Sequence, residues 1–164
     1  EGVGTIAGLP FRVLKTLELG GSMSGHPGSE GAAEALLKAP TLSTLTHLNL
    51  WAFGVDAKAT AVLAAAPASK HLVDLNLQSN HGGDAAHASH ARSPHLRALK
   101  SLNLGHCHAT DAGVRVLLEA PWIDNLKARV AAKHPWTLLL WQVKASAATK
   151  KAFEDRLGAG AVVW

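Results

Sequence analysis

The chain has few reactive and aromatic residues. It contains one cysteine, one methionine and no tyrosine, and Phe, Trp and Tyr together make up 5% of its 164 residues. A single cysteine excludes an internal disulfide, and no Asn-X-Ser/Thr glycosylation acceptor is present in the sequence. Both absences favour a reducing compartment, so we expect a cytoplasmic protein.

The sequence also lacks long apolar runs and targeting signals. No stretch of about 18 uncharged apolar residues occurs, and WTLLLWQV at 136–143 is too short to cross a bilayer. The N-terminus has neither a basic segment followed by an apolar one nor an initiator methionine. We therefore expect no membrane span, and we expect the chain to be a fragment of a longer one.

Positive charge is concentrated at the C-terminal end. The formal net charge is +4 at pH 7. Residues 1–125 hold nine Lys/Arg and ten Asp/Glu, whereas residues 126–164 hold seven Lys/Arg and two Asp/Glu. The sequence pI of about 9.5 therefore reflects the last segment and does not mark the whole chain as a nucleic-acid-binding protein.

The sequence does contain a repeat of 27 residues. Five sets of identical residues recur at this interval: Leu45, Leu72, Leu99 and Leu126; Leu48, Leu75 and Leu102; Leu50, Leu77 and Leu104; Asn49, Asn76 and Asn103; and Pro40, Pro67, Pro94 and Pro121. A fixed period of this length indicates stacked structural units, each of which buries its apolar face against its neighbours.

One unit, LKSLNLGHCHATDAGVRVLLEAP at 99–121, shows what each repeat is expected to form. The alternation around Leu102 and Leu104 predicts a strand that places its leucines in the core. Asp111 is predicted to cap the helix that follows, in which apolar residues recur at helical spacing. Pro121 then ends the unit and turns the chain toward the next strand.

This pattern resembles the leucine-rich repeat, L-x-x-L-x-L-x-x-N/C-x-L, over roughly residues 9–126. The resemblance implies an α/β solenoid, right-handed and curved, with parallel strands on the concave face and helices on the convex face. DAGVRVLL is similar to the intracellular classes, which are the ribonuclease-inhibitor-like repeats and the cysteine-containing repeats of F-box partners. We expect about four units in 1–125 and a divergent, basic C-terminal cap in 126–164.

Three departures from the ideal repeat carry further expectations. The first two strands are 31 residues apart, and the extra residues fall in the glycine-rich GGSMSGHPGSEG. In the third unit Ser89 and His90 replace apolar residues, which predicts a short or frayed helix or a partly hydrated His90 ring. In the cap, TLLLWQV is expected to form a strand, and SAATKKAFEDRLG a helix that starts near Ser146 and stops at Gly158.

The lone cysteine and the histidines around it are expected to be structural or solvent-exposed. Cys107 falls at the N/C position of the repeat, where a small side chain packs under the turn or hydrogen-bonds the loop backbone. His106, His108 and His81 lie near it, but a closed zinc site needs four ligands in a tetrahedral array. We expect no metal, no cofactor and no catalytic residues, because the repeat already accounts for these positions.

The strand side chains that point away from the core form the predicted partner-binding site. Within this stripe, an exposed Trp51 amid polar groups is typical of an interface anchor. The alternative is a solvated face on which the asparagines form a ladder. The predicted binding residues are Glu18, His47, Asn49, Trp51, Asp74, Asn76, Gln78, Ser101 and Asn103, and Thr16, Gly20 and Gly105 share their face.

The resemblance implies a protein–protein interaction module, or scaffold, without catalytic activity. Two alternatives follow from related repeats: a GTPase-activating fragment and a ubiquitin-ligase substrate adaptor. The sequence has no F-box-like stretch and no strong match to the arginine-bearing loop of the GTPase activators. Two further alternatives are a metal-dependent activity at the histidine-rich loops, and contact of Lys150, Lys151 and Arg156 with nucleic acid or an anionic membrane.

Overall fold

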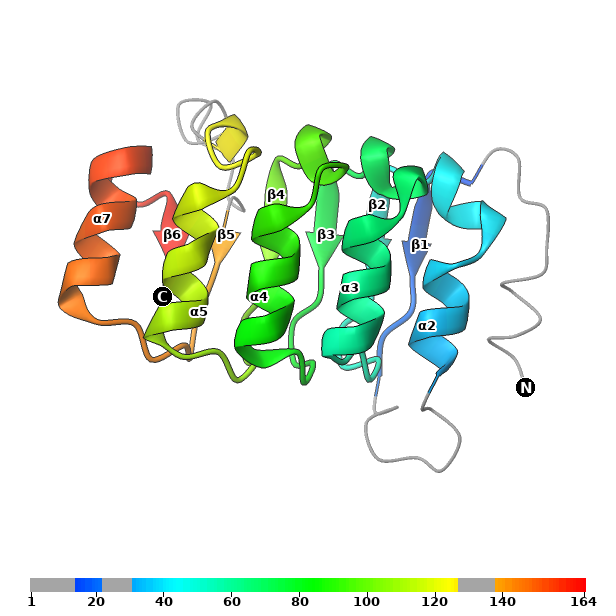
Figure 1. The fold of residues 1–164 in the computed structure, drawn as a ribbon, viewed down its shortest axis with the longest axis horizontal. Coiled ribbons are helices and arrows are strands. Elements are labelled where there is room, and N and C mark those ends of the chain that lie inside the picture. The colour runs from blue at the N-terminus through cyan, green and yellow to red at the C-terminus, as the bar shows by residue number, and fades with distance from the viewer. Residues whose placement is uncertain (1–13, 22–30, 127–137) are drawn as a thin grey trace.

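Strands and helices alternate along the chain in the computed structural model, which describes residues 14–21, 31–126 and 138–164 (Figure 1). The strands form one sheet whose spatial order follows the chain, and every neighbouring pair is parallel. They are β1 (Thr16–Glu18), β2 (His47–Asn49), β3 (Asp74–Asn76), β4 (Ser101–Asn103), β5 (Leu138–Leu139) and β6 (Val162–Val163). A parallel sheet in chain order is the arrangement that stacked repeats produce.

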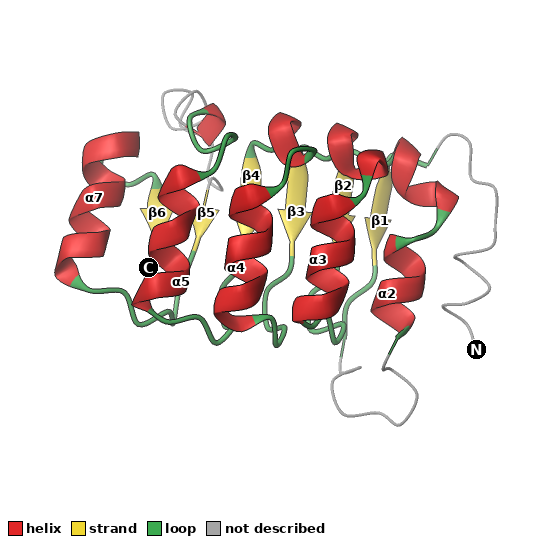
Figure 2. Ribbon diagram, viewed as in Figure 1, coloured by secondary structure: helices red, strands yellow, loops and turns green. Residues whose placement is uncertain are grey.

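The helices all lie on one side of this sheet (Figures 1 and 2). Short 3₁₀ turns at Pro40–Thr44, Pro67–His71, Leu96–Ala98 and Leu117–Glu119 follow the helices of the first four units. The helices are α2 (Ala32–Leu37), α3 (Ala57–Ala65), α4 (Gly83–Arg92), α5 (Asp111–Val116) and α7 (Ala147–Leu157). Strands on one face and helices on the other confirm the predicted α/β solenoid.

The leucine columns of the sequence are the core of the fold. Leu48, Leu75 and Leu102 pair with one another across three adjacent strands and are almost completely buried. Leu50, Leu77 and Leu104, two residues further on, are equally buried. The predicted 27-residue register therefore holds through the central repeats.

A buried asparagine ties the turns of two successive repeats together. The Asn80 side chain accepts a hydrogen bond from the Val55 N–H at 2.8 Å and donates to the carbonyls of Leu50 and Leu77, each at 2.8 Å. These backbone groups would otherwise be buried without partners, which is unfavourable. Asn80 therefore shows what the N/C position of the repeat does.

Each of the strands β1 to β5 leads into a turn that contains a residue with positive φ. Ala52, Ser79, His106 and Gln142 have φ between 49° and 60°, and Gly21 occupies the corresponding place in the first unit. Residues other than glycine rarely adopt this left-handed conformation, so its recurrence shows that one turn geometry is imposed throughout. The recurrence at Gln142 extends this geometry into the last segment of the chain.

Aspartates link the helix N-termini of neighbouring repeats, which corrects the expectation for Asp111. The N-cap of α5 is Thr110, and the Asp111 carboxylate accepts from the Ser146 N–H of the next unit at 2.6 Å. Likewise Asp84 accepts from the N–H and the hydroxyl of Thr110, at 2.6 and 2.7 Å. An aspartate in the first turn of each of these helices thus bonds the next unit rather than its own backbone.

The surroundings of these aspartates affect both their pKa values and the residue that can stand at position 113. The hydrogen bonds from Thr110 lower the pKa of the Asp84 carboxyl, and the Ser146 N–H does the same for the pKa of Asp111. Asp84 also packs directly on α5, because a Cβ added to Gly113 would lie 2.2 Å from its Oδ1. Glycine at 113 is therefore required for the close approach of α4 and α5.

The last segment joins the sheet at a changed spacing. Leu138 pairs with Leu102, so 36 residues separate these two strands in place of 27, and Leu138 pairs with Val162 after only 24. Leu126 nevertheless keeps the first leucine column, because it is fully buried like Leu72 and Leu99 and its N–H likewise donates to the carbonyl three residues earlier. The division of the chain at residue 125 stays a prediction.

The expected elements of this segment are confirmed. β5 lies within TLLLWQV, and α7 begins after Ser146, whose hydroxyl accepts from the Thr149 N–H at 3.1 Å. Gly158, with φ of 96°, ends α7. Residues 9–13, most of the glycine-rich loop, and Arg129 and Ala131, which stand at the two leucine positions after Leu126, lie outside the described residues.

Helix α4 contradicts both expectations for the third repeat. It is ten residues long, and the side chain of His90 is fully buried. His90 occupies the repeat position that Leu36, Leu63 and Leu117 hold in the other units. Those leucines pack into the core, so the His90 ring is buried at the same place. Neither ring nitrogen of His90 has a hydrogen-bond partner among the described residues.

Burial keeps the His90 ring neutral in the folded protein. It lowers the pKa of His90 from the ordinary 6.5 to about 3, and burial likewise lowers the pKa of the adjacent His87. In the unfolded chain these rings take up protons below about pH 6.5. Acid therefore favours the unfolded state, and stability is lost as the pH falls from 6.5 toward 3.

We predict that His90→Leu makes the protein more stable and less sensitive to acid. Leucine is the residue of this column in the flanking repeats, and it removes two unpaired ring nitrogens, so stability at pH 7 should rise by about 1 kcal/mol or more. When the pH is lowered from 7 to 5, the variant should lose about 2 kcal/mol less unfolding free energy than the unaltered protein does. Urea unfolding at the two pH values measures both effects.

His71→Gln is the control, because it replaces a histidine that is exposed to solvent. That variant should keep the pH dependence of the unaltered protein. An His90→Leu protein that loses as much stability between pH 7 and pH 5 as the unaltered one would contradict the burial of a neutral ring at this position.

Candidate binding face

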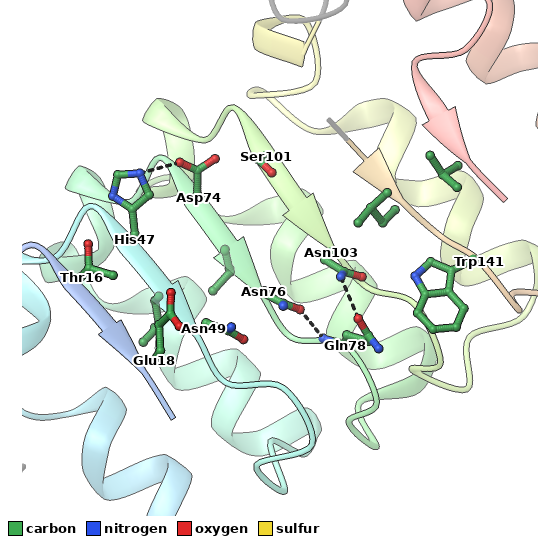
Figure 3. Close-up of a pocket in the computed structure, with 14 residues that line it drawn as sticks. Thr16, Glu18, His47, Asn49, Asp74, Asn76, Gln78, Ser101, Asn103 and Trp141 are labelled. Carbon is green, nitrogen blue, oxygen red and sulfur yellow. Dashed lines mark hydrogen bonds and ion pairs between the residues drawn. The ribbon is translucent and has the colours of Figure 1, made fainter. Parts of the chain in front are cut away.

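The sheet is hollowed on the side opposite the helices into a groove of about 960 Å³ (Figure 3). All six strands or the residues just after them contribute to it. The groove residues are Thr16, Glu18, His47, Leu48, Asn49, Asp74, Leu75, Asn76, Gln78, Ser101, Asn103, Leu139, Trp141 and Val163. Because alternate strand residues point to opposite faces, the same strands supply both this groove and the core.

Eight of the nine predicted binding residues line this groove, and Trp51 does not. Trp51 lies just past the end of β2, where 42% of it is exposed. It packs on Gly20 of the preceding unit, since a Cβ added there would lie 3.2 Å from the indole Cε3. The structure therefore brings the polar residues together and leaves Trp51 at their margin.

Trp141 also lines the groove, although it is not among the residues predicted from the sequence to bind a partner. It follows β5 as Trp51 follows β2, so Trp51 is not the only large aromatic on this side. Its indole lies against Gly105, where an added Cβ would come within 2.5 Å of Nε1, and packs edge-on to His106 at 4.6 Å. The recurrence of LNLW at 48–51 as LLLW at 138–141 was the signal that could have revealed it.

A histidine–aspartate pair joins β2 to β3 on this face (Figure 3). His47 Nε2 lies 2.8 Å from Asp74 Oδ2, and its Nδ1 lies 2.8 Å from the Thr46 hydroxyl. The ring is therefore held at both nitrogens. This pair fixes the orientation of two of the predicted binding residues.

The asparagine column shapes the ends of the strands. Asn49, Asn76 and Asn103 each accept, through Oδ1, the backbone N–H two residues further on, at 3.0 to 3.2 Å. Asn103 also donates from Nδ2 to Gln78 Oε1 at 3.0 Å, which links two repeats (Figure 3). These asparagines thus serve the turns as well as the surface, as short polar side chains commonly do in such turns.

Cys107 occupies the buried position expected for it. Its thiol is 2% exposed and donates to the Leu77 carbonyl at 3.1 Å. Burial raises the pKa of this thiol to about 11, so the reactive thiolate is disfavoured. Cys107 therefore takes the place that Asn80 holds one repeat earlier.

The histidines near Cys107 lie in the turns rather than around it. His81 and His108 are exposed and stack on each other with ring centroids 5.3 Å apart. Within 14–21, 31–126 and 138–164, no three His, Cys, Asp or Glu side chains gather closely enough to hold a metal ion. None of the helices in these ranges is long and apolar enough to cross a membrane.

Three basic residues of the C-terminal segment, Lys150, Lys151 and Arg156, contact other side chains. Lys151 pairs with Asp155 at 2.9 Å and Arg156 with Asp124 at 3.0 Å. Lys150 Nζ lies over the ring of Trp164, 5.2 Å from its centroid. Two of the three positive charges are thus offset by nearby carboxylates.

A sheet of six parallel strands in chain order, backed by helices on one face, defines an α/β fold of the leucine-rich-repeat type. A solved structure of the tropomodulin C-terminal domain from Caenorhabditis elegans is similar, with a TM-score of 0.63. The match covers 95% of this chain and 89% of that chain at 14% sequence identity, which shows a common fold. No family model and no curated protein matches the sequence.

We predict that Cys107 reacts slowly with a thiol-labelling reagent in the native protein and rapidly after denaturation, because burial keeps it protonated and covered. Cys107→Asn should fold, since Asn80 shows that an amide suits this position. Native labelling as fast as that of the denatured chain would contradict a structural thiol. Labelling is read by mass spectrometry and folding by a melting curve.

Proposed function

We propose that this chain is a protein-binding module that holds its partner on the groove face of the sheet and has no catalytic activity of its own. The observation that carries the proposal is the groove itself. Its side chains stand on hydrogen-bonded strands and are further fixed by the His47–Asp74 and Asn103–Gln78 contacts. A face of this kind binds with little loss of side-chain freedom.

The repeat class and the setting of the module are part of the proposal. The asparagine and cysteine at the N/C position support a ribonuclease-inhibitor-like or cysteine-containing repeat, and the solitary buried thiol supports a cytoplasmic scaffold. A GTPase-activating or ubiquitin-adaptor role gains no support from the described residues. Contact of the basic tail with nucleic acid is not favoured either, because Lys151 and Arg156 are already paired with acids.

Site-specific photo-cross-linking tests where the partner binds. A photoreactive amino acid at Thr16, exposed in the groove, should cross-link the partner, whereas the same group at the exposed Ala85 of α4 should not. Both positions tolerate a large side chain, because both are exposed. Cross-links that form equally well from Ala85 would place the partner on the helices and overturn the proposal.

We predict that Trp51→Ala weakens the complex with the cross-linked partner at least about tenfold, which is roughly 1.4 kcal/mol. An exposed tryptophan beside a polar groove supplies apolar area and an indole N–H. Charge reversal at Lys150 and Lys151 should leave the affinity unchanged at physiological salt. Titration calorimetry decides: a silent Trp51→Ala with a failing tail variant would move the site to the C-terminal segment.

A further inference from the structure

The groove changes its chemistry along its length. One column of paired strand positions runs across all six strands, from Glu18 through Asn49, Asn76 and Asn103 to Leu139 and Val163. It begins with a carboxylate, continues with three amides and ends with two aliphatic side chains. Figure 3 shows Glu18 over β1 and Trp141 beside β5, at opposite ends of the groove.

The end formed by β1 to β3 is acidic. Glu18 is exposed, and within the described ranges its carboxylate makes no ion pair. Asp74 adds a second carboxylate, which the His47 ring shares. No Lys or Arg is among the described residues that line the groove. A cationic group bound at this end would therefore meet no Lys or Arg on the groove walls.

The opposite end, formed by β5 and β6, is apolar. Leu139 is 7% exposed and forms the floor, Val163 is 45% exposed, and the Trp141 indole stands beside them. Val163 and Trp51 are the two large apolar residues that the described part of the chain leaves exposed. An apolar side chain buried here would remove this surface from water, which favours binding.

We propose that the groove binds a protein segment that carries a Lys or Arg near one end and a large apolar side chain near the other. This inference rests on the proposed function and adds the chemistry of the partner. Glu18 and Leu139 are four strands apart, which is about 19 Å at the usual spacing, and Val163 adds about 5 Å. A helix of about 13–16 residues spans that distance, so two short anchors on one segment reach both ends.

Selection from a library of random 16-residue peptides displayed on phage tests the inference with the full chain as bait. Peptides that bind in the groove are identified by a Gln78→Trp variant of the chain, because the larger side chain fills the centre of the groove and prevents their binding. The expected consensus pairs a basic residue with an aliphatic or aromatic one at a fixed separation. One such synthetic peptide is then measured against variants of the chain by fluorescence anisotropy.

Glu18→Lys should lower the affinity of the chain for the synthetic peptide at least tenfold. Exchanging the peptide's basic residue for Glu should restore binding to that variant. The control Glu154→Lys reverses an exposed acid on α7 and should have no effect. Val163→Asp should also lower the affinity for the peptide at least tenfold. Its control, Ala148→Asp on α7, should leave the affinity unchanged. Circular dichroism confirms that each variant is folded.

The outcomes separate the inference from the proposed function. Groove-dependent peptides that lack the basic residue, or that bind Glu18→Lys and Val163→Asp as well as the unaltered chain, overturn the two-ended partner but leave the groove as a binding site. A selection that yields no peptide blocked by Gln78→Trp overturns this inference, and cross-links from Ala85 in place of Thr16 would overturn the proposed function itself. Restored binding on charge exchange supports the inference.

Discussion

The structure depends on the stacking of leucines between adjacent units. A three-residue strand and a short helix cannot shield their own apolar side chains, so each repeat is stable only when its neighbours cover it. Leu48, Leu75 and Leu102 provide that cover from one strand to the next. The polar links at Asn80, Asp84 and Asp111 fix the separation and orientation of units that the leucines hold together.

Features that repeat in the sequence could be predicted from it, and features that depend on a break in the repeat could not. The leucine columns indicated the sheet, its register and eight of the groove residues. The position of Trp141 was missed because the longer interval before β5 moves it out of the 27-residue register. His90 was misjudged because composition suggested a wet ring, whereas the column it occupies packs it into the core.

Side-chain hydrogen bonds between repeats were the hardest feature to predict. Asp111 satisfies the sequence pattern of a helix cap, yet its carboxylate bonds Ser146, which lies 35 residues further along the chain. Which N–H group an aspartate accepts from depends on how closely successive helices pack, and for Asp84, which bonds Thr110, Gly113 permits the close approach of α4 and α5. The residue type indicates a cap, but the packing selects the donor.

The unequal spacing of the strands also shows that the binding face does not depend on the number of residues between one strand and the next. Paired strand residues lie 31, 27, 27, 36 and 24 positions apart, yet the parallel pairing continues without interruption from β1 to β6. Insertions and deletions between strands therefore leave the order of groove side chains intact. A family of such chains could diverge widely in length while presenting the same row of side chains, so similarity of binding would be found by aligning strands rather than whole sequences.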